Sequence, residues 1–240
     1  MLFDLRGRGR RRTVQVIYLS LALLMGGGLV LFGIGSDVNG GLFDAISGND
    51  DNGNDAIEKQ VDDAEKRVKA NRSDAKAWAA LAQAKFQLAA VSDGYDDTQG
   101  TFSGDARKKV DEAVRAWDQH LKLAGNKPDA DVAAILTRAF LAIDQPEKAV
   151  RTQEIVIDSL KNPGPGDYSS LAQYAYAAGQ TRKGDLSAQK AVEDAKEEGL
   201  PKDRRDQLKA QLDAIKQQAA QQAAQEATQG AGGAAAPATP

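Results

Sequence analysis

The feature that most constrains this chain is an uncharged apolar segment close to its N-terminus. No charged residue stands between Thr13 and Ser36, and the stretch Val14–Gly35 reads VQVIYLSLALLMGGGLVLFGIG. A helix of roughly 22 residues at ~1.5 Å per residue spans about 33 Å, enough to cross a ~30 Å hydrocarbon core. The segment therefore predicts a single transmembrane helix over residues 13–36.

Two other interpretations of this segment stay open. A cleaved signal peptide has a shorter apolar region, about 7–15 residues long, followed by small residues at the cleavage site. Gly33 and Gly35 form only a weak version of such a site. A buried core helix rarely contains more than ~14 consecutive apolar residues. We favour an uncleaved signal anchor, because the segment is longer than either alternative requires.

A basic N-terminus precedes the apolar segment and predicts its orientation. The first twelve residues carry five arginines: Arg6, Arg8, Arg10, Arg11 and Arg12. Basic residues are retained on the cytoplasmic side of a membrane, so residues 1–12 are predicted to be cytoplasmic and the chain after Ser36 to lie outside. The expected location is therefore a bacterial inner (cytoplasmic) membrane, with the bilayer contacted through residues 13–36.

The charge of the remaining chain argues against nucleic acid as a partner. The whole chain has a net charge of −3, and the basic N-terminus means that the rest is more acidic still. Binding to phosphates needs clustered Lys and Arg, which an acidic body does not supply.

Composition divides the chain after the apolar segment into three parts. Residues 37–54 are rich in Gly, Asn, Asp and Ser, which is typical of a flexible linker. Residues 217–240 form a low-complexity tail of Gln, Ala, Gly and Pro that has no means of building a core. Between them, residues 55–216 are rich in Ala, Lys, Glu and Gln and poor in aromatics, which favours helix over strand.

Apolar residues in this middle part recur at steps of three and four, the period of an amphipathic helix. Ile57, Val61, Ala64 and Val68 mark the first such face. Short Gly-, Asn- and Pro-containing turns separate the helices. Helices are predicted at 55–72, from Asp74 to Ala90, and at 105–124, 129–143, 147–161, 167–178, 182–198 and 201–225, with turn-forming residues in 92–104 interrupting the pattern.

Self-comparison reveals a period of 35 residues. Leu136 matches Leu171, and Ala149 matches Gly184. A period near 34 with two helices per unit indicates a helical solenoid. The residues that repeat are Trp78, Leu81 and Ala82 with Ala113 and Trp117; then Ala133, Leu136, Thr137, Phe140 and Ala149; then Tyr168, Leu171, Ala172, Gly179, Gly184, Ala188 and Ala191.

These residues resemble the tetratricopeptide repeat (TPR) family over roughly residues 74–198. The sequence departs from the family pattern at Lys85, where an aromatic is usual, and at Thr137 and Gly184, where other small residues are commoner. The expected fold is therefore all-α: a transmembrane helix followed by an α-solenoid of about three TPR-like hairpins. Helices flanking the hairpins are expected to cap the ends, because a hairpin alone cannot bury its apolar faces.

The resemblance implies a concave groove, lined by the first helix of each repeat, that receives peptide segments. Carried over position by position, the groove residues are Ala79, Gln83, Phe86, Ala134, Arg138, Leu141, Ser169, Gln173 and Tyr176. Their mixed character suits a peptide with an apolar anchor. Arg138 is the single cation among them, so the family's carboxylate clamp is rejected. The alternative is that Phe86, Leu141 and Tyr176 pack against neighbouring helices.

Two interpretations of the aromatic residues in the 92–104 insertion also stay open. Tyr95 and Phe102 either form a partner contact or fold back over the first repeat.

The chemistry-bearing residue types are too few for an enzyme site. The chain has no cysteine, and His120 is its one histidine. Neither a nucleophilic triad nor a metal site has a second member, and the acidic runs follow helix faces. We expect no catalytic residue, no cofactor and no metal.

The predicted function is that of a membrane-tethered protein–protein interaction adaptor or scaffold with an unidentified protein partner. One alternative is an envelope structural protein that self-associates. Another is a periplasmic chaperone-like helper of a membrane translocation complex, since the layout of basic N-terminus, single span and helical repeats resembles such proteins.

Overall fold

The computed structural model describes residues 51–96 and 98–231. The elements are α3 (Asp51–Ala70), α4 (Ala75–Ala90), β1 (Tyr95–Asp96), β2 (Thr101–Phe102), α5 (Gly104–Ala124), α6 (Ala130–Ala142), α7 (Pro146–Ser159), α8 (Pro165–Ala177), α9 (Thr181–Glu197) and α10 (Lys202–Ala231). The prediction of an all-α fold is confirmed for this part of the chain, where one short hairpin is the exception.

Several predicted segments lie outside the described residues. They are the basic N-terminus 1–12, the apolar segment 13–36, the linker 37–54 up to residue 50, and the last part of the tail, 232–240. The described residues all belong to one compact unit, Asn49–Pro240, which we call the second unit of the chain. Among the helices of the described residues, none combines the length and the apolar character needed to cross a membrane.

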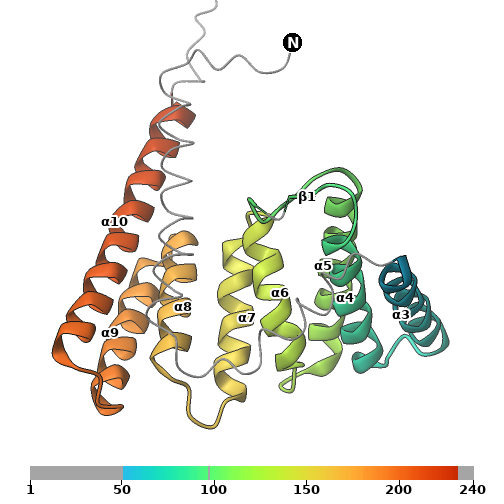
Figure 1. The fold of residues 1–240 in the computed structure, drawn as a ribbon, viewed down its shortest axis with the longest axis horizontal. Coiled ribbons are helices and arrows are strands. Elements are labelled where there is room, and N and C mark those ends of the chain that lie inside the picture. Colours follow the sequence, from blue (N-terminus) through green and yellow to red (C-terminus); the bar gives the residue numbers. More distant parts are fainter. Residues whose placement is uncertain (1–50, 97, 232–240) are drawn as a thin grey trace, which may run out of the picture. The chain divides into compact units, whose positions relative to one another are not determined.

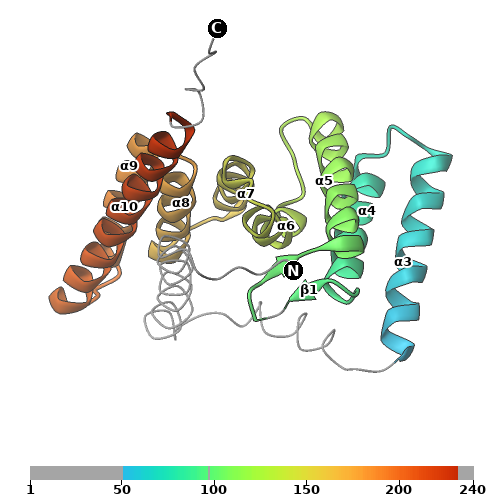
Figure 2. The ribbon, with the colours of Figure 1, turned by 90° about the horizontal axis from the view of Figure 1, so that it is seen from above.

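Three helix pairs follow one another along the second unit (Figures 1 and 2). The pairs are α4 with α5, α6 with α7, and α8 with α9, and each pair is joined by its own short connection or insertion. Helix α3 packs against α4 at one end of the row, and α10 packs against α8 and α9 at the other. Both end helices therefore cover an apolar face that would otherwise meet solvent.

Small residues let the paired helices approach closely. Ala82, Ala113, Ala133 and Ala149 are completely buried at the places where helices face one another. Larger side chains, with Trp117 the largest, fill the space between these contacts. This alternation of small and large residues is the packing that the sequence period encodes.

The 35-residue period is repeated in the backbone of two turns. The Gln145 amide donates to the Phe140 carbonyl, and 35 residues later the Gln180 amide donates to the Ala175 carbonyl, both at 2.8 Å. Each hydrogen bond lies at the C-terminal end of a helix, and the residue just before the donor has a positive φ. That residue is Asp144 (φ 58°) in the first turn and Gly179 (φ 68°) in the second.

Asp144 is the one described non-glycine residue with a positive φ, and its replacement should raise stability. Asp144→Gly is expected to stabilise the domain by about 0.5–1 kcal/mol, because glycine has no Cβ to strain this conformation. The measurement is the midpoint of urea unfolding. Gly179→Ala is the matched control: no atom lies within 4 Å of an added Cβ, so it should lose a similar amount through backbone strain alone. A lower midpoint for Asp144→Gly would contradict the argument.

The insertion between α4 and α5 forms a β-hairpin, which the sequence pattern did not predict. Tyr95 pairs with Phe102 across the two strands, and their rings stack at 4.7 Å. The Phe102 ring also meets the edge of Phe86 on α4, with 5.9 Å between centroids. The two aromatics therefore fold back over the first helix pair, which was one of the two interpretations of this segment.

Two helix boundaries differ from those predicted by more than two residues. Helix α3 begins at Asp51 rather than 55. Helix α10 continues to Ala231, into the predicted low-complexity tail, because Ala and Gln favour helix. Its packing against the domain ends near Ala219, and the side chains of residues 220–225 are exposed.

Candidate functional site

The structure separates the nine predicted groove residues into three groups. Ala134, Arg138 and Leu141 are exposed on α6, and Gln83 and Gln173 are half-buried. Ala79, Phe86, Ser169 and Tyr176 are buried. These last four side chains therefore have little exposed surface, and a groove lined by all nine residues stays a prediction.

The buried residues are covered by particular neighbours. Phe86 lies beneath Phe102 of the hairpin. The Tyr176 ring packs over Gly184, and its hydroxyl donates to Asp185 Oδ1 at 3.0 Å. The alternative of packing against neighbouring elements thus holds for Phe86 and Tyr176. It does not hold for Leu141, which is 38% exposed.

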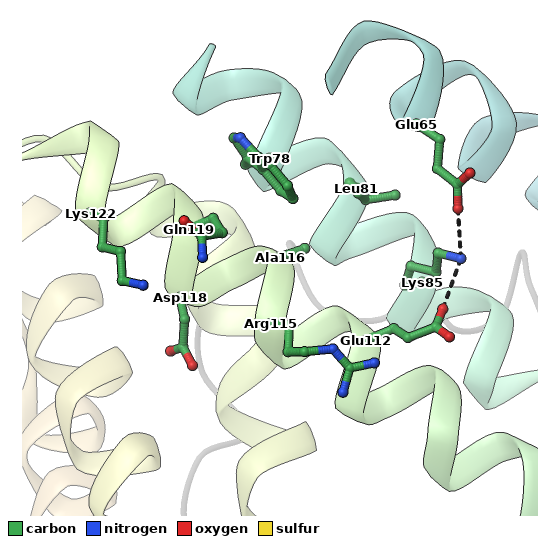
Figure 3. Close-up of a pocket in the computed structure, with 10 residues that line it drawn as sticks. All are labelled: Glu65, Trp78, Leu81, Lys85, Glu112, Arg115, Ala116, Asp118, Gln119 and Lys122. Atoms are coloured by element: carbon green, nitrogen blue, oxygen red, sulfur yellow. Dashed lines mark ion pairs between the residues drawn. The ribbon is translucent and has the colours of Figure 1, made fainter. Parts of the chain in front are cut away.

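A different groove is open between α3 and α5, with α4 as its floor (Figure 3). Its volume is about 690 Å³. Trp78 and Leu81 of α4 and Ala116 of α5 supply its apolar surface. The Trp78 indole N–H donates to the Arg72 carbonyl at 2.9 Å, which fixes the orientation of the half-buried ring. We refer to this feature as the α3–α5 groove.

An ion bridge closes one end of the α3–α5 groove. Lys85 Nζ lies 2.9 Å from Glu65 of α3 and 2.8 Å from Glu112 of α5, as the dashed lines in Figure 3 show. Burial alone would lower the pKa of Lys85, but its hydrogen bonds with the two carboxylates outweigh burial and raise it. The hydrogen bond from Lys85 lowers the pKa of Glu65. One lysine, at a position where the TPR pattern has an aromatic, therefore ties three helices together.

Removing this lysine should cost stability in a pH-dependent way. Lys85→Met leaves two carboxylates facing each other, and we expect a loss of about 1–2 kcal/mol at pH 7 after allowance for their partial exposure. Because the pKa of Glu65 is below its ordinary 4.5, the bridge contributes above that pH and is lost as pH falls through the lowered value. The difference between wild type and variant should therefore shrink at pH 3.

Urea unfolding at pH 7 and pH 3 measures this difference. Lys66→Met is the control. Among the described residues Lys66 pairs only with exposed Asp63, so its loss should change stability by less than about 0.5 kcal/mol. A loss for Lys85→Met that is the same at both pH values would contradict the role of the ion bridge.

The other part of the groove carries two exposed cations. Arg115 and Lys122 are exposed on α5, and neither forms an ion pair with the described residues. They stand seven residues apart, two helical turns along one face. The third carboxylate of the groove, Asp118, is paired with Lys148 of α7 at 3.0 Å. Within the described chain, the groove's carboxylates are thus all paired and its unpaired charges are both positive.

The predicted groove and the α3–α5 groove use different faces of α4. Trp78, Leu81 and Lys85 lie on one stripe, whereas Ala79 and Phe86 lie roughly 130° further around the helix axis. The sequence signal that was missed is the stripe of α5 in which two cations frame a small residue, Ala116. None of these three residues was singled out from the sequence.

His120 is buried, with 2% exposure, and serves as a structural link. Its Nδ1 lies 2.8 Å from the Ala75 carbonyl oxygen, and the Asp129 amide donates to its Nε2 at 2.9 Å. These partners require a neutral ring with the proton on Nδ1. Both ring nitrogens are therefore engaged with backbone groups. In the part of the chain that the structure describes, no cluster of three His, Asp or Glu residues suits a metal ion.

No protein-family model, curated protein or solved structure matches this chain. The resemblance to the tetratricopeptide family therefore stays a prediction from the repeated residues and their 35-residue spacing. Function has to be argued from the geometry of the α3–α5 groove and from the sequence.

Proposed function

We propose that this chain is a membrane-tethered adaptor that holds a protein partner in the α3–α5 groove. The observation that carries the proposal is the combination of an apolar floor, formed by Trp78 and Leu81, with the unpaired cations Arg115 and Lys122. Apolar surface at the centre and charged groups at the rim are the features by which protein surfaces bind one another selectively.

The repeat domain in this proposal is a TPR-like solenoid of three hairpins with α3 and α10 as caps. The repeated residues in the sequence and the equivalent turns at Asp144 and Gly179 support this relationship. Stacked hairpins make a rigid support, because each hairpin is held by its neighbours. A groove on such a support is already ordered before binding, so binding loses less conformational entropy.

The membrane attachment belongs to the same proposal. Residues 13–36 span a bacterial inner membrane, the N-terminal arginines stay in the cytoplasm and the repeat domain lies outside. Since the chain has no cysteine, Leu5→Cys and Asp50→Cys variants report topology by labelling intact cells with an impermeant thiol reagent. Labelling of position 50 but not of position 5 is expected. The reverse pattern would overturn the orientation.

The partner is identified by photo-crosslinking from the groove in the full-length membrane protein. A crosslinking amino acid replaces Gln119, a groove residue on α5, and a control replaces Leu186 on α9, which is 60% exposed and lies outside the groove. A distinct protein captured from position 119 and not from 186 supports the adaptor. Capture of a second copy of this chain favours the self-associating structural protein instead. Equal capture from both positions would contradict a role for the groove.

A further inference from the structure

We propose that the segment bound in the α3–α5 groove is an acidic, amphipathic helix of the partner. One apolar side chain of that helix packs on Trp78 and Leu81, and two of its carboxylates pair with Arg115 and Lys122. This inference rests on the proposed function and specifies the chemistry of the partner.

The charges of the groove select an acidic partner. Lys85 pairs with Glu112 and Glu65, and Lys69 pairs with Glu65 as well, at 3.4 Å. Asp118 pairs with Lys148 of α7, so three lysines balance the three carboxylates. The charge left over comes from Arg115 and Lys122, although the chain as a whole has a net charge of −3. A carboxylate from a partner therefore gains an attractive contact without displacing an existing ion pair.

The spacing of the two cations selects a helical partner. Arg115 and Lys122 are seven residues apart on α5, which places them about 10 Å apart along one face of the helix. Two carboxylates seven positions apart on a second helix have the same separation and the same facing. An extended strand has no residues at that separation on one face, because same-face residues recur every ~6.6 Å.

The floor of the groove supplies the place for the apolar anchor. Ala116 stands beside Arg115 on α5, and its small side chain leaves room above Trp78 and Leu81. A Leu or Phe at the fourth or fifth position, between the two carboxylates, falls on this floor when the helices lie side by side. The ion bridge at Lys85 closes the groove at the end away from Lys122, which limits how far the bound helix extends.

The test uses the full-length protein in phosphatidylcholine nanodiscs and a display library of random twelve-residue peptides. Binding is followed through Trp78 fluorescence, since the second tryptophan, Trp117, is buried and remote from the solvent. Selected peptides are expected to carry acidic residues seven positions apart around a Leu or Phe. Their affinity should fall at least about tenfold in the Arg115→Gln/Lys122→Gln variant and also as salt is raised.

Charge reversal gives the sharpest readout. The Arg115→Glu/Lys122→Glu variant should select basic peptides in place of acidic ones, while Lys127→Glu/Lys161→Glu, at exposed positions outside the groove, should leave the acidic selection unchanged. Peptides that alter Trp78 fluorescence without any enrichment of acidic residues would overturn this inference and leave the adaptor function standing. If no selected peptide altered Trp78 fluorescence, the binding role of the groove itself would be refuted.

Discussion

Replacing Gly184 with Ala is expected to destabilise the domain by about 2–3 kcal/mol, because the new Cβ would overlap the ring of Tyr176. That ring has little freedom to move. Tyr176 is 5% exposed, and its hydroxyl is bound to Asp185, which in turn pairs with Lys216 of α10 at 2.7 Å. The clash is therefore with a fixed group, and thermal or urea unfolding of the purified domain measures its cost.

The second helix pair supplies the compensating change. Leu141 and Ala149 stand 35 residues before Tyr176 and Gly184. The second helix pair therefore has Leu in place of Tyr on its first helix and Ala in place of Gly on its second. Tyr176→Leu alone should also destabilise, because it leaves a cavity and removes the hydrogen bond from the tyrosine hydroxyl to Asp185. The double variant Tyr176→Leu/Gly184→Ala should be more stable than the sum of the two losses predicts. Strict additivity would show that the two positions do not share one packing contact.

His120→Ala is expected to destabilise the domain by roughly 2–4 kcal/mol, through a cavity and the loss of two buried hydrogen bonds. The imidazole joins the start of α4, at Ala75, to Asp129, the residue that caps α6. It also stacks on Trp117, with 4.8 Å between ring centroids. The first and second helix pairs should therefore loosen together.

Two amide substitutions separate the two hydrogen bonds of His120. The side chain of His120→Asn can still donate to Ala75, whereas that of His120→Gln reaches Asp129 and can still accept its amide proton. Both variants should fall between wild type and His120→Ala in urea unfolding. If all three variants lost the same stability, the stabilisation would come from ring packing and not from the hydrogen bonds.

The positions of the helices could be predicted from the sequence because each carries a strong local signal. Residues such as Pro146 and Gly179 mark helix starts and ends, and the apolar stripes between them recur at three and four residues. The hairpin at 95–102 had no comparable signal, since its strands are two residues long. It is held by a tertiary contact, the packing of Phe102 on Phe86.

The candidate site was less accessible to sequence reasoning. The resemblance to the tetratricopeptide family predicted that Phe86 and Tyr176 face a groove. Phe102 of the insertion covers Phe86 instead, and the absence of a side chain at Gly184 lets the Tyr176 ring pack there. The cations at Arg115 and Lys122 are visible in the sequence, yet whether a charge is paired depends on which helix lies opposite. Lys148, for example, neutralises Asp118 across 30 positions of the chain. Exposure and pairing are properties of the assembled helices, and periodicity alone does not contain them.

The two halves of helix α10 differ in how far they pack against the domain. Leu208 and Leu212 anchor its first half against the domain, whereas the side chains from residue 220 to 225 are exposed. The hydrogen bonds of the outer half depend largely on helix propensity, and a short helix with little packing is marginal in water. Amide hydrogen exchange should therefore be slow around Leu212 and approach the free-peptide rate beyond Ala219. One continuous helix would then contain both some of the most protected and some of the least protected amides of the domain.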